Sequence, residues 1–158
     1  MKTFFQNKKF LIPIFVFLLI ASFYVIFSPG KIKSDALEYD KLSNSILIGS
    51  YSIDGTPSML REPGYPFFRA ILKFLNFSTN GILIIQTLLY AITVILIGLT
   101  CFKIDNRIGI LGLWGASLAY GLAFYPSHHL SETLTAFILS VVGLLLITAI
   151  DNLKRKYL

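Results

Sequence analysis

Three carboxylates lie close together near the start of a long polar stretch: Asp35, Glu38 and Asp40. A carboxylate can act as a general base toward a hydroxyl acceptor, which is the chemistry of group transfer. Acidic residues at the start of a helix also have an ordinary role, because they interact favourably with the helix dipole. Residue types alone leave both interpretations open, and composition favours the structural one.

The second group is the run Arg61-Glu62-Pro63-Gly64-Tyr65-Pro66. Two prolines and a glycine within four residues define a rigid turn. The guanidinium of Arg61 has the planar fork that binds a phosphate through two hydrogen bonds. The alternative is a helix-entry turn that carries a surface arginine, and the motif on its own favours this simpler interpretation.

The third group is the run His128-His129-Leu130-Ser131-Glu132. Ser131 is expected to cap a helix with Glu132 in its first turn, where free backbone N–H groups favour an anion. His129 and Glu132 could share a metal ion, but two ligands are too few to define a zinc site. We therefore assign no metal and no cofactor, and a divalent ion stays an unsupported option. Interface anchoring or phosphate contact by His128 is preferred.

Membrane helices are the elements that must position these groups. The chain has 158 residues and is 55% hydrophobic, above the roughly 45–50% of soluble domains. Four runs without charged residues are each long enough to cross ~30 Å of hydrocarbon. The expected spans are about 10–28, 81–102, 108–126 and 133–150. The first is expected to be an uncleaved anchor, because no small-residue cleavage site follows its long apolar core.

Basic residues predict the orientation of these spans. With the N-terminus in the cytoplasm, the inner segments hold eight basic and two acidic residues, and the outer segments hold six of each. A basic excess on the cytoplasmic side favours this arrangement, and it explains the net charge of +6 without nucleic acid as a partner. Both termini are then cytoplasmic, and the large polar loop 29–80 lies outside a bacterial plasma membrane. The lone cysteine, Cys101, excludes an internal disulfide.

The outer loop is expected to contain two helices. Ser34 as N-cap and Gly49 as stop signal delimit the first, over 35–48. Turn signals follow at Asp54-Gly55 and Thr56-Pro57. One face of the first helix carries four residues: Asp35, Glu38, Tyr39 and Leu42.

The second outer helix is expected from Pro66 to Asn76. A broad apolar face opposes a polar stripe of Arg69, Lys73 and Asn76, a pattern that suits a helix lying flat among lipid headgroups. Packing against the spans is an equally open alternative. Within the spans, Gln86 is expected to bond a neighbouring helix. A close-packing face is expected from the small residues of the third span: Gly112, Gly115, Ala116, Ala119 and Ala123.

The predicted fold class is all-α. We expect one polytopic membrane domain over 1–158, with about four transmembrane helices and a two-helix extracytoplasmic first loop. In their order along most of 10–150, the segments of this chain resemble the N-terminal part of bacterial GT-C integral-membrane glycosyltransferases, the group of the protein mannosyltransferases and the aminoarabinose transferases. The resemblance rests on Ser34-Asp35-Ala36-Leu37-Glu38-Tyr39, Thr56-Pro57-Ser58, Arg61-Glu62-Pro63-Gly64-Tyr65-Pro66-Phe67-Phe68, Gln86-Thr87-Leu88-Leu89 and Leu130-Ser131-Glu132-Thr133-Leu134.

The resemblance implies transfer of a sugar from a polyprenyl-phosphate donor to an acceptor at the outer membrane face. The acidic residue of the first outer loop is then the catalytic base, a role that falls on Asp35, with Glu38 as the next candidate. The expected substrate-binding residues are Tyr39, Arg61, Tyr65, His128, His129 and Glu132. The expected partners are membrane lipid, the lipid-linked sugar and another membrane chain.

The alternative function is a non-enzymatic membrane subunit or remnant that binds lipid-linked sugar or partner helices. It stays open because full members of the family carry more spans, so the chain is complete, a fragment or one part of an assembly. A transporter component is disfavoured, since no charged residue lies inside a run. A separation above about 10 Å between Asp35 and both Arg61 and the start of the fourth span would favour the non-enzymatic role, because a base acts at hydrogen-bond range.

Overall fold

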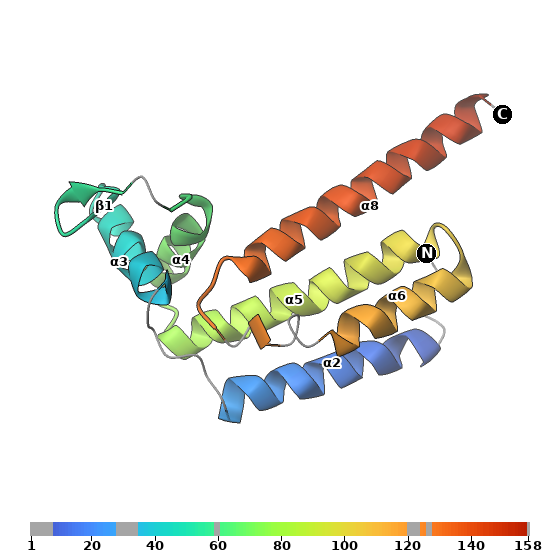
Figure 1. The fold of residues 1–158 in the computed structure, drawn as a ribbon, viewed down its shortest axis with the longest axis horizontal. Coiled ribbons are helices and arrows are strands. Elements are labelled where there is room, and N and C mark those ends of the chain that lie inside the picture. The colour runs from blue at the N-terminus through green and yellow to red at the C-terminus, as the bar shows by residue number, and fades with distance from the viewer. Residues whose placement is uncertain (1–7, 28–34, 59–60, 120–123, 126–127, 158) are drawn as a thin grey trace.

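The computed structural model describes residues 8–27, 35–58, 61–119, 124–125 and 128–157, and helices dominate it (Figure 1). The all-α class is thereby confirmed. The two strands form one short antiparallel hairpin. The elements are α2 (Lys8–Phe27), α3 (Asp35–Leu47), β1 (Ser52–Ile53), β2 (Thr56–Pro57), α4 (Gly64–Phe74), α5 (Thr79–Phe102), α6 (Asn106–Leu118) and α8 (Glu132–Tyr157).

Three helices in the described part of the chain are long and apolar enough to cross a membrane. They contain Phe10–Phe27 of α2, Thr79–Phe102 of α5 and Glu132–Lys154 of α8. These segments match the expected spans 10–28, 81–102 and 133–150. The match is close because each run lacks charged residues over its whole length. The one proline inside these three runs is Pro13, in the second turn of α2.

The expected span over 108–126 is not confirmed as one helix. α6 ends at Leu118, because Ala119 leaves the helical region with φ −63° and ψ 110°. A helix of 13 residues is about 20 Å long, which is too short for ~30 Å of hydrocarbon. The chain nevertheless passes from one end of α5 to the other. Asn106 follows the last turn of α5, whereas the carbonyl of His128 accepts a hydrogen bond of 2.7 Å from Gln86, near its start.

α5 and α8 extend between two ends of the bundle, whereas the shorter α6 stops part of the way along α5 (Figure 1). At one end, Lys103 after α5 pairs with Asp151 of α8 at 3.4 Å, and Phe10 of α2 contacts Phe102 of α5. At the other end, α5 and α8 begin beside α3 and α4. The basic residues around Lys103 and the acidic group of α3 are therefore separated by the length of the bundle.

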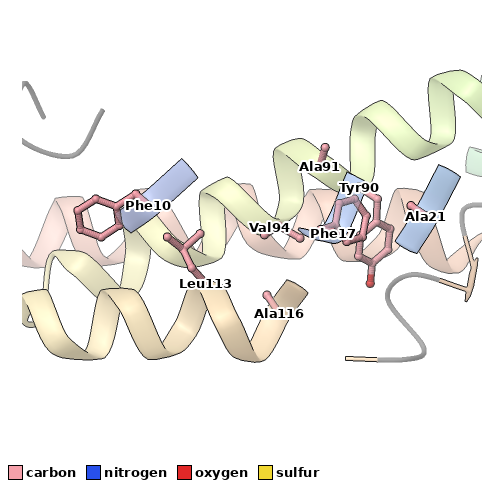
Figure 2. Packing of buried hydrophobic residues seen from close by; sticks show 8 residues of the cluster. All are labelled: Phe10, Phe17, Ala21, Tyr90, Ala91, Val94, Leu113 and Ala116. Carbon is pink, nitrogen blue, oxygen red and sulfur yellow. The ribbon is translucent and has the colours of Figure 1, made fainter. Parts of the chain in front are cut away.

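The hydrophobic core lies where α2, α5 and α6 meet (Figure 2). The ring of Phe17 stacks on that of Tyr90 with centroids 5.8 Å apart, and Val94 and Leu113 are fully buried. Figure 2 shows these side chains along one seam between the helices. The seam packs α5, the helix that carries Gln86, against α2 and α6.

Small residues of α6 allow this helix to approach α5 closely. A Cβ on Gly109 would lie 2.9 Å from Phe102 Cα, and one on Gly112 would lie 2.7 Å from Cys101 Sγ. The predicted packing face is confirmed at Gly112 and Ala116, which is buried. It is wrong for Gly115, where a Cβ would meet nothing within 4 Å. Ala123 lies outside the described residues.

α3 begins at the expected Asp35, ends at Leu47, one residue before the expected Ile48, and has the expected stop at Gly49. Gly49 adopts φ 77°, and its N–H bonds the carbonyl of Ile46 while the N–H of Ser50 bonds that of Ser45. This is a Schellman motif, for which a residue with positive φ is required. The expected N-cap, Ser34, lies outside the described residues.

The hairpin after α3 turns at Asp54 and Gly55. Their φ angles of 52° and 83° match the two-residue type I′ turn, which prefers this dipeptide. Pairing of Ile53 with Thr56 places Thr56-Pro57 in the return strand β2. The second turn signal is therefore wrong, because the residues already belong to the strand that follows the turn.

α4 begins two residues before the expected Pro66 and ends at Phe74, so Asn76, exposed and with φ 61°, lies beyond the helix and outside its polar stripe. The other two residues of the stripe, Arg69 and Lys73, face α3. Arg69 has no exposed surface, whereas Phe67, Ile71 and Phe74 are at least half exposed. α4 packs mainly on α3 and reaches α5 through Tyr65. The apolar face of this helix is thus the uncovered one.

Candidate functional site

Arg61 binds both expected catalytic carboxylates. Its Nη2 donates to Asp35 Oδ1, and its Nε donates to Glu38 Oε2 at 2.6 Å. Asp35 and Glu38 are three residues apart on α3 and so share one face, as predicted. The side chains of Asp35 and Glu38 are 49% and 43% exposed, so a ligand can reach them. The cluster of these three residues carries a net charge of −1 and is called the carboxylate cluster below.

Two tyrosines hold Arg61 in this place. The hydroxyl of Tyr51 donates to the Arg61 carbonyl at 2.8 Å, and the guanidinium lies 5.5 Å from the ring centroid of Tyr39. A guanidinium over an aromatic face is stabilised by the ring quadrupole. Hydrogen bonds to Glu38 and Asp35 raise the pKa of Arg61, so it stays charged at any working pH. The fork that the sequence assigns to a phosphate therefore engages two carboxylates in this structure.

Buried hydrogen bonds connect the region of the carboxylate cluster to the long apolar helices α5 and α8. Tyr39 and Tyr65 are buried with their rings edge to face at 5.0 Å. The Tyr39 hydroxyl contacts the Ser131 hydroxyl at 3.2 Å, and Tyr65 donates to Gln86 Oε1 at 2.7 Å. Burial raises the pKa of Tyr65, which keeps this hydroxyl a donor. Gln86 thus bonds a neighbouring helix, as predicted.

The remaining expected residues are spread around the start of α8. The ring of His128 lies 4.0 Å from that of Phe124, and its Nδ1 is 3.2 Å from the Phe124 carbonyl. His129 is 1% exposed, and burial, followed by Arg69, lowers its pKa to about 4. Glu132 is exposed in the first turn of α8. The structure therefore brings Asp35, Glu38, Tyr39 and Arg61 together, with Tyr65 adjacent, and leaves the two histidines and Glu132 beside that group.

A second ionic group on α3 and α4 was not predicted. Arg69 Nη2 donates to Asp40 Oδ1, and Lys73 Nζ donates to the same oxygen at 2.8 Å and to Asn44 at 2.7 Å. Burial acts to raise the pKa of Asp40, but Lys73 and Arg69 outweigh it and hold the pKa below its usual value. In the sequence, the only indication of this group was the spacing of Arg69 and Lys73, which places them one helical turn apart on the same face. Their partner, Asp40, could not be predicted because it depends on how α3 and α4 pack.

Several polar side chains near this group are buried without a hydrogen-bond partner among the described residues. They are Arg69 at Nε and Nη1, His129 at both ring nitrogens and Thr133 at Oγ1. Each such atom costs about 1–3 kcal/mol relative to a satisfied one. Arg69 and Thr133 were not among the predicted site residues, because in sequence one reads as a surface arginine and the other as a helical threonine.

No protein-family model matches this chain, and no curated protein or solved structure matches it. A function must consequently be argued from the geometry and chemistry of the site itself.

Proposed function

We propose that the chain is a membrane sugar transferase of the GT-C type. It moves a sugar from a polyprenyl-phosphate donor to an acceptor hydroxyl at the outer face of a bacterial plasma membrane. The supporting observation is the contact of Arg61 with both Asp35 and Glu38 beside the start of α8. Asp35 and Arg61 are in direct contact, so they lack the wide separation that would favour a non-enzymatic role. Tyr39, on the same helix as Asp35, contacts Ser131 at the start of α8.

The proposed membrane placement follows from charge and from the exposed apolar surface. The end of the bundle with Lys103 and Lys154 faces the cytoplasm, because basic residues are retained there. Four passages then bring both termini inside, the third of them starting with α6. The uncovered apolar face of α4, with Phe67, Ile71 and Phe74, lies in the outer headgroup region.

In the proposed reaction Asp35 acts as the general base. Its carboxylate takes the proton of the acceptor hydroxyl, and the acceptor oxygen bonds to the anomeric carbon of the sugar from the face opposite the phosphate. The bond between that carbon and the phosphate oxygen breaks, and the phosphate leaves with the electron pair, so configuration inverts. Arg61 holds the carboxylate of Asp35 in position, and Glu38 binds the same guanidinium.

The test is a transfer assay in membranes that contain the full chain and labelled polyprenyl-phosphate sugars. Replacing Asp35→Asn keeps the size of the side chain but removes the base, so transfer should fall by about 10²–10⁴-fold. Asp54→Asn is the matched control, because Asp54 is an exposed carboxylate of the same loop that pairs with Lys41 at 3.0 Å. Equal transfer by wild type and Asp35→Asn would refute the assignment of the base.

A non-enzymatic membrane subunit is the second candidate, and the surface of α8 favours it. α8 packs on α5 but leaves Leu139, Leu145 and Leu146 largely exposed. Small and hydroxyl side chains line a groove between the two helices, a composition typical of helix contacts in membranes. They include Thr93, Thr100, Ala136, Ser140 and Gly143. Correct insertion with donor binding but without transfer by the wild type would favour this candidate.

A further inference from the structure

A group of buried polar atoms without partners involves α4 and the start of α8, apart from the carboxylate cluster. Arg69 of α4, His129 just before α8 and Thr133 in the first turn of α8 are at most 1% exposed, and the charge of Arg69 acts on His129. The Nε and Nη1 atoms of Arg69, the Thr133 hydroxyl and both ring nitrogens of His129 have no hydrogen-bond partner in the described part of the chain. Buried polar atoms are nearly always satisfied in proteins, so a group of them indicates that a ligand completes the site.

The charge around these donors is positive. Arg69 and Lys73 share a single carboxylate, that of Asp40, which leaves this group with a net charge of +1. His129 is neutral at pH 7, since burial and the nearby Arg69 disfavour its charged form. One ring nitrogen therefore remains a donor and the other an acceptor. A monoanion would balance the excess charge of +1.

The start of α8 adds further donors at the same place. The Thr135 N–H bonds the Ser131 carbonyl at 3.0 Å, which makes Ser131 the residue before the helix. The Ser131 hydroxyl contacts Tyr39. The backbone N–H groups of 132–134 have no acceptor within the described ranges. The N-terminus of a long helix favours an anion through these groups and through the helix dipole.

We propose that Arg69, His129 and Thr133, together with the first turn of α8, form a binding site for a phosphate group. A phosphate offers acceptor oxygens to a guanidinium, a hydroxyl and backbone N–H groups at once. The donors are enclosed, so the phosphate enters when α4 separates from the segment that carries His129 and Thr133. The contacts that open are the hydrogen bonds of Tyr65 with Gln86 and of Tyr39 with Ser131.

The phosphate has two possible sources, a lipid headgroup or free inorganic phosphate, and the proposal does not depend on sugar transfer. The experiment uses the full chain in detergent and in lipid nanodiscs. Binding is followed by ³¹P line broadening and by the midpoint of thermal unfolding, with inorganic phosphate in one arm and polyprenyl phosphate in the other. Saturable binding in the first arm identifies a small anion, and binding only in the second identifies a lipid headgroup. Either result supports the site.

Three variants test which residues bind. Thr133→Val keeps the volume and the charge of the site, and phosphate binding should weaken at least about tenfold through loss of a hydroxyl donor. Arg69→Gln should abolish binding, and His129→Gln tests the third residue if Arg69→Gln fails to fold. Arg107→Gln is the control, because Arg107 is an exposed arginine at the start of α6. No binding in either arm, or equal binding by wild type and Thr133→Val, would overturn the proposal.

Discussion

The hydroxyl of Tyr39 lies 3.2 Å from that of Ser131, although 92 residues separate them in the chain. The contact joins α3 to the start of α8. The ring of Tyr39 also lies beneath the guanidinium of Arg61. One buried phenol therefore links the carboxylate cluster to the start of the long apolar helix α8, and this link can be tested directly.

Replacing Tyr39→Phe should lower the free energy of unfolding by about 0.5–1.5 kcal/mol, because one hydrogen bond is lost while the ring contacts remain. Thermal unfolding in detergent measures the change for Tyr39→Phe, Ser131→Ala and the double variant. The double variant should be as stable as the less stable of the two single variants, because each single substitution already removes the same hydrogen bond. Strictly additive losses would show that the two hydroxyls do not interact.

On the proposed function, Arg61→Lys should reduce sugar transfer at least about tenfold despite the conserved charge. An ammonium lacks the planar fork that bonds two carboxylates at fixed positions, so Asp35 would lose its orientation. The effect should appear in kcat more than in KM, measured with a labelled donor in membranes. Lys41→Ala is the control: its ion pair with Asp54 is exposed, and exposed pairs contribute about 0–1 kcal/mol. Full activity of Arg61→Lys would argue against a positioning role.

Stability should depend on pH through His129. Its folded-state pKa of about 4 lies below the ordinary 6.5, so the unfolded chain takes up the proton first as the pH falls. This contribution is fully present above about pH 6.5 and is lost as the pH falls toward 4, by up to about 3 kcal/mol. The groups acting on His129 are Arg69, Asp40, His128 and Lys73.

Unfolding midpoints measured between pH 7 and pH 4.5 check this dependence, and His129→Gln should flatten the profile. Asp40 acts in a different window. Its folded-state pKa lies below 3.8, so its stabilising contribution is lost only as the pH falls through that lower value. A variant profile as steep as that of the wild type would assign the pH dependence to another group.

Replacing Gly109→Ala should destabilise the bundle by about 1–3 kcal/mol, because the new methyl meets backbone that cannot move away. Its Cβ would lie 2.9 Å from Phe102 Cα. Gly115→Ala is the matched control on the same helix, since a Cβ there meets nothing within 4 Å. Resistance to unfolding in detergent compares the two. Equal stability of both variants would contradict the close approach of α6 to α5.

The long apolar helices and the local stops were predictable because their causes are local in the sequence. A charge-free apolar run predicts a helix long enough to cross a membrane, as for α2, α5 and most of α8. Gly49 and Asp54-Gly55 adopt the positive φ angles that their turns require. The shared face of Asp35 and Glu38 follows from helical periodicity. The third run, 108–126, misled because hydropathy does not register where a helix ends, and α6 ends at Leu118.

By itself, the sequence determined the helical class, the apolar runs and the face of α3 that carries the acids. Only the tertiary structure decided that Arg61 binds both Asp35 and Glu38, that Arg69 is buried against Asp40, and that His129 and Thr133 are buried. Periodicity shows which residues share a face but not which other face will cover them. Ionic partners and burial depend on packing between segments that are distant in the chain, and that information is not local.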